Sequence, residues 1–221
     1  ALYAAPDRQV WLGLRNGALA VWRSGAIRSA GIEGLPAFPV RAILPGPDGD
    51  LWIASRGGGV WHIPNGATQA LAVDGGLHSL RINALVRLPD QRLLAATDSG
   101  AAVLTGDRWT HLAKAGMPSP RTLALHADST GVLVGTDKGY IELDLQLRPL
   151  PVDERFAGHQ PLALPHNVVL SILRSTTGDI WMGTPAGLVH LSRRGGVPTI
   201  STITERNGLG HDLVRCLHQD R

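Results

Sequence analysis

The stretch that decides the fold is Leu51-Trp52-Ile53-Ala54-Ser55-Arg56-Gly57-Gly58, a short apolar strand that ends in a small residue and a glycine turn. Residues 10–17, 93–100, 132–139 and 180–187 follow the same pattern. The second position of the pattern falls at 11, 52, 94, 133 and 181, so the spacings are 41, 42, 39 and 48. A period near 42 residues with about four strands per unit is typical of a β-propeller blade.

Flanking segments supply the other strands of each unit. An apolar strand and a turn precede the core, as at 40–44 followed by Pro47-Asp48-Gly49, and such residues favour the tight turns of hairpins. An alternating third strand and a more polar fourth strand follow, as at 60–63 and 69–73. We therefore predict an all-β chain, a propeller segment spanning 1–221 with four-stranded antiparallel blades. The blade cores lie near 10–22, 51–63, 93–104, 132–143 and 180–192.

Each core places a small residue and an aromatic or leucine side chain at fixed positions. We expect the small residues to lie where adjacent blades pack face to face, because a larger side chain would push the blades apart. They are Gly13, Ala54, Ala96, Gly135 and Gly183. We expect the residue two positions earlier to fill the layer between blades: Trp11, Trp52, Leu94, Leu133 and Trp181.

The composition excludes several other classes of protein. A total of 27 Gly and 15 Pro in 221 residues excludes a coiled coil or a long helical bundle, and one Cys excludes a disulfide framework. The net charge of +3 comes from 19 Arg and 2 Lys spread along the chain, so we expect no nucleic-acid partner. The nine His lack metal-ligand spacing. We predict no metal and no cofactor.

The repeat resembles the two-component regulator propeller repeat. The second copy contains Gly34-Leu35-Pro36, Asp48-Gly49, Leu51-Trp52-Ile53-Ala54-Ser55 and Gly58-Gly59-Val60, and the fifth contains Ile180-Trp181-Met182-Gly183-Thr184 and Gly187-Leu188. The third and fourth copies lack the Trp. The resemblance implies a periplasmic sensor of a bacterial membrane receptor that ends in a histidine kinase or a diguanylate cyclase. It also implies oligosaccharides as ligands, because some members sense them.

The two ends of the repeat leave open how the ring closes. Ala1 aligns with Ala42, inside a first strand, and a sixth copy begins at residues 208–214 and stops before its own Trp strand. The chain is either an excised part of a seven-bladed propeller, which we favour, or a five-bladed ring closed by its last strand. An open array would leave blade edges free to pair with another copy, so we expect that a homo-oligomer could form.

One face of a propeller carries the turns between second and third strands together with the loops that lead into the first strands. We predict that a polar or anionic ligand such as an oligosaccharide binds there. The alternative is a solvated rim of turn-forming residues. The long insertion at 149–165 is a candidate specificity loop. The candidate ligand-binding residues are Arg15, Arg56, Asp98, Asp137, Lys138, His159, His166 and Asn167.

Enzymatic motifs are absent from the sequence. It contains no Gly-x-Ser-x-Gly elbow, no His-Glu-x-x-His and no phosphate loop. We therefore predict no catalytic residues and a non-catalytic, periplasmic ligand-sensing segment, attached to the membrane only through other parts of a parent receptor. Two alternatives stay open: a carbohydrate-active lyase or hydrolase on a propeller fold, and a protein-interaction scaffold.

Overall fold

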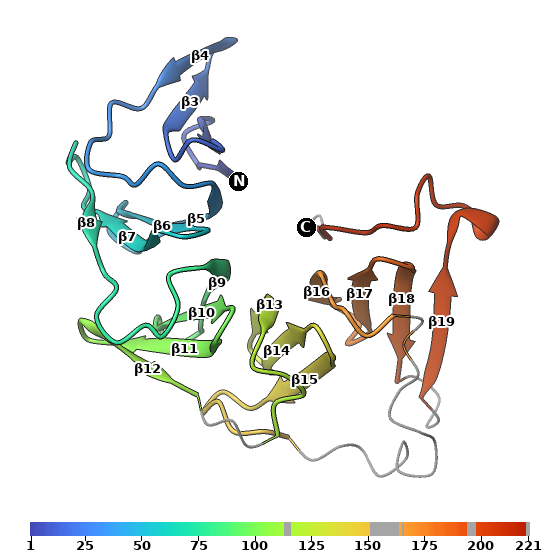
Figure 1. Cartoon of the computed structure of the whole chain (residues 1–221). Coiled ribbons are helices and arrows are strands. Elements are labelled where there is room, and N and C mark those ends of the chain that lie inside the picture. The colour runs from blue at the N-terminus through green and yellow to red at the C-terminus, as the bar shows by residue number, and fades with distance from the viewer. Residues whose placement is uncertain (113–115, 151–163, 165, 194–197, 220–221) are drawn as a thin grey trace. The chain divides into compact units, whose positions relative to one another are not determined.

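The computed structural model describes residues 1–112, 116–150, 164, 166–193 and 198–219. The chain forms two compact units, one of Ala1–Arg87 with Gln91–Leu112 and one of Leu88–Asp90 with Ala113–Arg221. Every sheet is antiparallel and keeps its strands in sequence order, as the labels in Figure 1 show. Such serial hairpins are the topology predicted for propeller blades.

The first unit holds three four-stranded sheets, blades 1 to 3. Blade 1 consists of β1 (Leu2–Ala4), β2 (Val10–Gly13), β3 (Leu19–Arg23) and β4 (Ala26–Ser29). Blade 2 consists of β5 (Val40–Pro45), β6 (Leu51–Ser55), β7 (Gly59–Ile63) and β8 (Leu71–Ala72). Blade 3 consists of β9 (Ile82–Arg87), β10 (Leu93–Thr97), β11 (Gly100–Thr105) and β12 (Arg108–His111).

The second unit holds blades 4 and 5. Blade 4 has three strands among the described residues, β13 (Thr122–Asp128), β14 (Gly131–Thr136) and β15 (Gly139–Leu143), and Pro149 bridges to Leu143 at its outer edge. Blade 5 consists of β16 (Ser171–Arg174), β17 (Ile180–Thr184), β18 (Gly187–Ser192) and β19 (Thr199–Ile203). A short 3-10 helix, η2 (Glu205–Asn207), follows.

The small residues of the repeat lie against the next blade, as predicted. A Cβ on Gly13 would stand 2.4 Å from Cγ1 of Val40, and one on Gly135 would stand 2.7 Å from Cγ1 of Val169. Ala54 packs with Ile82 in a core cluster between blades 2 and 3. The sixth copy supplies the same kind of contact, because a Cβ on Gly183 would stand 2.6 Å from the carbonyl oxygen of Val214. The prediction is confirmed for these four of the five small residues.

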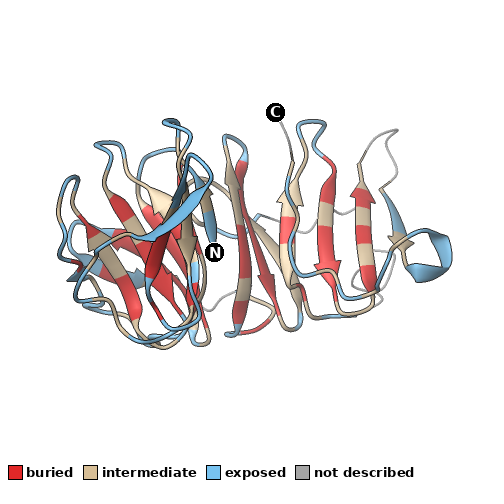
Figure 2. Ribbon diagram, turned by 90° about the horizontal axis from the view of Figure 1, so that it is seen from above, coloured by how far each residue is buried: buried red, intermediate tan, exposed pale blue. Residues whose placement is uncertain are grey.

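Apolar side chains form clusters between consecutive blades of a unit. Trp11 packs in the cluster between blades 1 and 2, and Trp52 packs in the one between blades 2 and 3. Leu133 is fully buried in the cluster between blades 4 and 5. Figure 2 shows this burial concentrated on the strands, while the connecting turns are exposed. The all-β, blade-forming architecture expected from the sequence is confirmed.

Candidate functional site

Buried hydroxyls close the turns between second and third strands. Thr136 Oγ1 donates to the carbonyl oxygen of Gly139 at 2.8 Å and accepts from the N–H of Lys138 at 3.0 Å. Ser55, Thr97 and Thr184 make the equivalent contacts in their own blades. Such a hydroxyl satisfies backbone groups that the turn would otherwise leave unpaired. The residue after it, such as Asp137, is therefore held at the end of the sheet.

In blades 2, 4 and 5 the loop that leads into the next copy of the repeat binds to the same turn. The N–H of Gly59 donates to the carbonyl oxygen of Leu80 at 2.9 Å, and that of Gly139 donates to the carbonyl oxygen of Asn167 at 2.7 Å. Gly187 makes the same bond to Asp212 at 2.7 Å. Turns and loops that are far apart in sequence thus meet within each unit. We call these turns and loops the turn rim.

In the first unit the turn rim carries Arg15, Arg56 and Asp98. Arg15 and Arg56 are exposed, and neither guanidinium contacts an acidic side chain among the described residues. Asp98 is half-buried: Asn83 Nδ2 donates to its Oδ1 at 2.9 Å, and Nη1 of Arg81 lies 3.7 Å from its Oδ2. Arg15 and Arg56 are therefore the cations of this unit's rim that are available to an external group.

In the second unit the turn rim carries Asp137, Lys138, His166 and Asn167. Lys138, His166 and Asn167 are exposed, and Nδ1 of His166 accepts from the N–H of Val168 at 3.1 Å. Oδ1 of Asp137 is buried without a hydrogen-bond partner in the described residues. A buried carboxylate oxygen without a donor is costly. The turn that contains Asp137 therefore carries a polar group that the described residues leave unsatisfied.

One predicted ligand residue and the predicted specificity loop cannot be placed. His159 and most of the insertion at 149–165 lie outside the described residues. Among the residues that are described, no three His, Cys, Asp or Glu side chains come together as a metal site. A helix of the length and hydrophobicity needed to span a membrane is likewise absent from the described residues.

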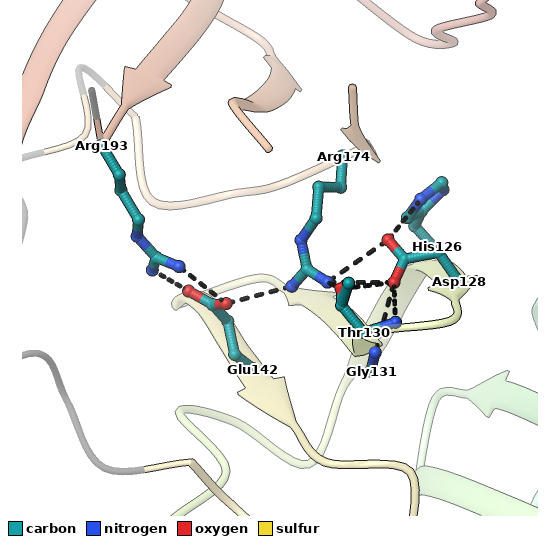
Figure 3. Close-up of polar contacts among 7 residues, drawn as sticks. All are labelled: His126, Asp128, Thr130, Gly131, Glu142, Arg174 and Arg193. Carbon is teal, nitrogen blue, oxygen red and sulfur yellow. Dashed lines mark hydrogen bonds and ion pairs between the residues drawn. The ribbon is translucent and has the colours of Figure 1, made fainter. Parts of the chain in front are cut away.

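A charged network joins blade 5 to blade 4 (Figure 3). Arg174, the last residue of β16, donates from Nη1 to Oδ1 of Asp128 and from Nη2 to Oε2 of Glu142, each at 3.1 Å. Arg193 also binds Glu142, with Nη1 3.1 Å from Oε2. The Arg174 side chain is only 9% exposed. The network therefore places a buried cation between two carboxylates of the preceding blade.

The same network changes the pKa of its members. Burial opposes ionisation of Asp128, but bonds from the Thr130 hydroxyl and N–H and the charge of Arg174 outweigh it and lower the pKa of the carboxyl. Burial lowers the pKa of His126, whose Nε2 lies 3.4 Å from Oδ2 of Asp128. Burial and the nearby Glu142 raise the pKa of Tyr140 to about 12. The neutral imidazole and the ionised carboxylate are thus the favoured forms.

This network was not predicted from the sequence, where no role was expected for Asp128, Arg174 or Arg193. A signal was available, because Arg87 and Arg174 end the first strands of blades 3 and 5. A cation repeated at one position of a buried strand suggests a partner on the adjacent blade.

The repeat tryptophans also have polar partners that the sequence did not reveal. Trp52 stacks on His62 with 4.4 Å between ring centroids, and Oδ2 of Asp50 accepts from both rings, at 3.0 Å from Trp52 and 2.6 Å from His62. Trp181 stacks on His190 at 4.0 Å in blade 5. The aromatic position therefore fills space and also orients a histidine.

Solved structures of other proteins share this architecture. The extracellular domain of the one-component system BT4673 from B. thetaiotaomicron matches all of this chain with a TM-score of 0.80 and 17% identity, over 30% of its own length. The extracellular domain of the hybrid two-component system BT3049 from the same organism matches 95% of this chain with a TM-score of 0.73 and 18% identity, over 28% of its own length. The fold is that of these receptor propellers. The resemblance seen in the repeat is confirmed at this level.

This chain also resembles enzymes that have the same fold. Virginiamycin B lyase from Staphylococcus aureus matches 91% of this chain with a TM-score of 0.70 and 13% identity, over 69% of its own length. No protein-family model and no curated protein matches the chain. The chain spans about 30% of the receptor domains that it resembles. Identities this low show the fold alone.

Proposed function

We propose that this chain is part of the extracytoplasmic, ligand-binding region of a bacterial transmembrane receptor and that it is not catalytic. The observation that carries the proposal is the turn rim of the first unit, which presents the exposed guanidinium groups of Arg15 and Arg56 on a fold shared with the extracellular domains of receptors. A periplasmic location and an output through a histidine kinase or a diguanylate cyclase are parts of the same proposal. Binding would act by favouring one arrangement of receptor domains over another.

The chemistry of the rim favours a polar ligand with negative charge, such as an acidic oligosaccharide. A guanidinium binds a carboxylate through two parallel hydrogen bonds, and it can also donate to the hydroxyl oxygens of a sugar. Asp98 is already satisfied by Asn83 and Arg81. It would therefore shape the rim rather than bind the ligand directly.

The test is a glycan-array and thermal-shift screen of the 221-residue chain, followed by calorimetric titration of each hit. We expect acidic oligosaccharides to bind, and the double variant Arg15→Gln, Arg56→Gln to weaken binding by about 100-fold, since two charge-assisted contacts are removed. Arg28→Gln, on the exposed outer strand β4, is the matched control and should bind as the wild type does. Equal binding by the double variant would contradict the proposed site, and turnover of a hit would contradict the non-catalytic assignment.

A further inference from the structure

The outer part of blade 3 contains two stacked histidines that are not among the candidate ligand-binding residues of the turn rim. His78, in the loop before β9, lies over His111, the last residue of β12, with 3.5 Å between ring centroids and 9° between ring planes. Both residues belong to the first unit. Two imidazoles in such contact are difficult to protonate at the same time, because the second proton would place two cations face to face.

The hydrogen bonds of His111 depend on its protonation. The backbone N–H of His78 lies 2.9 Å from Nε2 of His111, so it donates to that nitrogen when the nitrogen carries no proton. The carbonyl oxygen of Gly76 lies 3.2 Å from the same nitrogen and can accept from it only when it is protonated. Burial and the neighbouring His78 together lower the pKa of His111. The resting state therefore has a neutral His111.

The histidines line a cavity of about 430 Å³ together with Arg108, Gly76, Leu77, Trp109 and Thr110. Arg108 is exposed, and its guanidinium makes no ion pair or hydrogen bond in the described part of the chain. The segments that form the cavity also carry Asp74, Arg81 and Asp107, and none of these lines it. The cavity thus has three basic side chains and no carboxylate.

A transition-metal ion fits this arrangement poorly. A metal ion must lie close to the plane of each imidazole that binds it, at about 2.0–2.1 Å from the nitrogen. Two nearly parallel rings separated by 3.5 Å have no common in-plane point at that distance. The nearby Arg108 would also repel a cation. An anion in the cavity, in contrast, would compensate for all three basic groups.

We propose that His78, His111 and Arg108 form a binding site for a small oxyanion, such as a sulfate, phosphate or carboxylate group, and that the anion binds together with protons on the imidazoles. Arg108 supplies the fixed charge, and the two histidines supply charge that appears only when the anion offsets their mutual repulsion. The site uses none of the candidate ligand-binding residues of the turn rim, although the loop that carries His78 belongs to that rim. Binding would reinforce the loop that ends at Leu80, whose carbonyl oxygen accepts from Gly57 and Gly59 of blade 2.

Sulfate is the first probe, because it keeps its charge between pH 5 and 8. Histidine ring signals of the 221-residue chain are followed by NMR as a function of pH, in sodium sulfate and in sodium chloride of equal ionic strength. We expect sulfate to raise the titration midpoint of His111 by about one pH unit, which corresponds to up to about ten-fold tighter sulfate binding at pH 5.5 than at pH 7.5. Identical titration curves in the two salts would overturn the proposal.

Variants and other probes identify the source of the effect. Arg108→Gln and His78→Gln should each abolish the sulfate-dependent shift of His111, whereas Arg28→Gln should retain it. Phosphate and acetate, added in place of sulfate, show whether the site prefers a tetrahedral anion or a carboxylate. Binding of Zn²⁺ with no response to any of these anions would overturn the proposal and assign the pair to a metal. The wild-type titration decides the case even if a variant fails to fold.

Discussion

Arg87 and Arg174 occupy the same position of the repeat, and each guanidinium extends from the first strand of its blade to the preceding blade. Nη2 of Arg87 donates to the carbonyl oxygen of Pro45 at 3.0 Å, whereas Arg174 binds the side chains of Asp128 and Glu142. One repeat position thus makes two kinds of contact between blades. The contact of Arg174 is ionic because blade 4 places Glu142 opposite Leu133. At the equivalent position, blades 2 and 5 place a His opposite a Trp.

Replacing Arg174 with Met should destabilise the second unit by about 3 kcal/mol, because it leaves Asp128 partly buried without its cation. Met retains much of the apolar stem, so the loss measures the charge more than the packing. Amide hydrogen exchange in β13–β16 measures the change within this unit. Arg148→Met is the control: its ion pair with Asp144 is largely exposed, and water and salt screen it. Equal losses from the two variants would show that the buried network has no special role.

The stability of the second unit should fall in two stages as the pH is lowered. The pKa of His126 is lowered from 6.5, so the unfolded chain takes up this proton first, and stability declines as the pH falls below about 6.5. The pKa of Asp128 is lowered from 3.8, so its contribution is complete above that value and is lost as the pH falls below it. Urea unfolding at a series of pH values, followed by exchange in β13–β16, measures both stages.

The variant His126→Gln separates the two stages. It should remove the loss of stability that β13–β16 show between pH 7 and pH 5.5. The loss of stability below pH 4 should remain, since Asp128 keeps its bonds from Thr130 and Gly131. A variant that declined as steeply as the wild type near pH 6 would assign the first stage to another group.

Residues that follow the repeat could be predicted from the sequence, whereas contacts of residues that depart from it could not. Gly135 could be placed against the next blade because the period fixes the strand register, and register fixes which side chains face that blade. The Arg174 network could not be placed in this way. Its partner Asp128 is 46 residues away and departs from the repeat, so only the folded chain brings the two together. The turn rim was located by the same period, but the available charge of Arg15 and the satisfied charge of Asp98 depend on neighbouring side chains.

Gly135→Ala should destabilise the second unit by about 1–3 kcal/mol, because the new methyl group would overlap Cγ1 of Val169. The matched control is Gly210→Ala, since a Cβ there meets nothing within 4 Å. We expect the control to be neutral or slightly stabilising. A double-mutant cycle with Val169→Ala should give a favourable coupling of about 1 kcal/mol, as the smaller neighbour admits the methyl group. Additive effects would place the strain elsewhere.

Thr184→Val should destabilise blade 5 by about 1–3 kcal/mol, although the two side chains have nearly the same shape. The buried hydroxyl donates to the carbonyl oxygen of Gly187 at 2.9 Å and accepts from the N–H of Ala186 at 3.1 Å, so Val leaves both groups unsatisfied. Thr184→Ser keeps the hydroxyl and should lose less. Thr199→Val, on the exposed edge strand β19, should have little effect. Hydrogen exchange of the amides of Ala186 and Gly187 reports the turn directly. If Thr184→Val and Thr184→Ser gave equal protection there, the hydroxyl would not be the group that holds the turn.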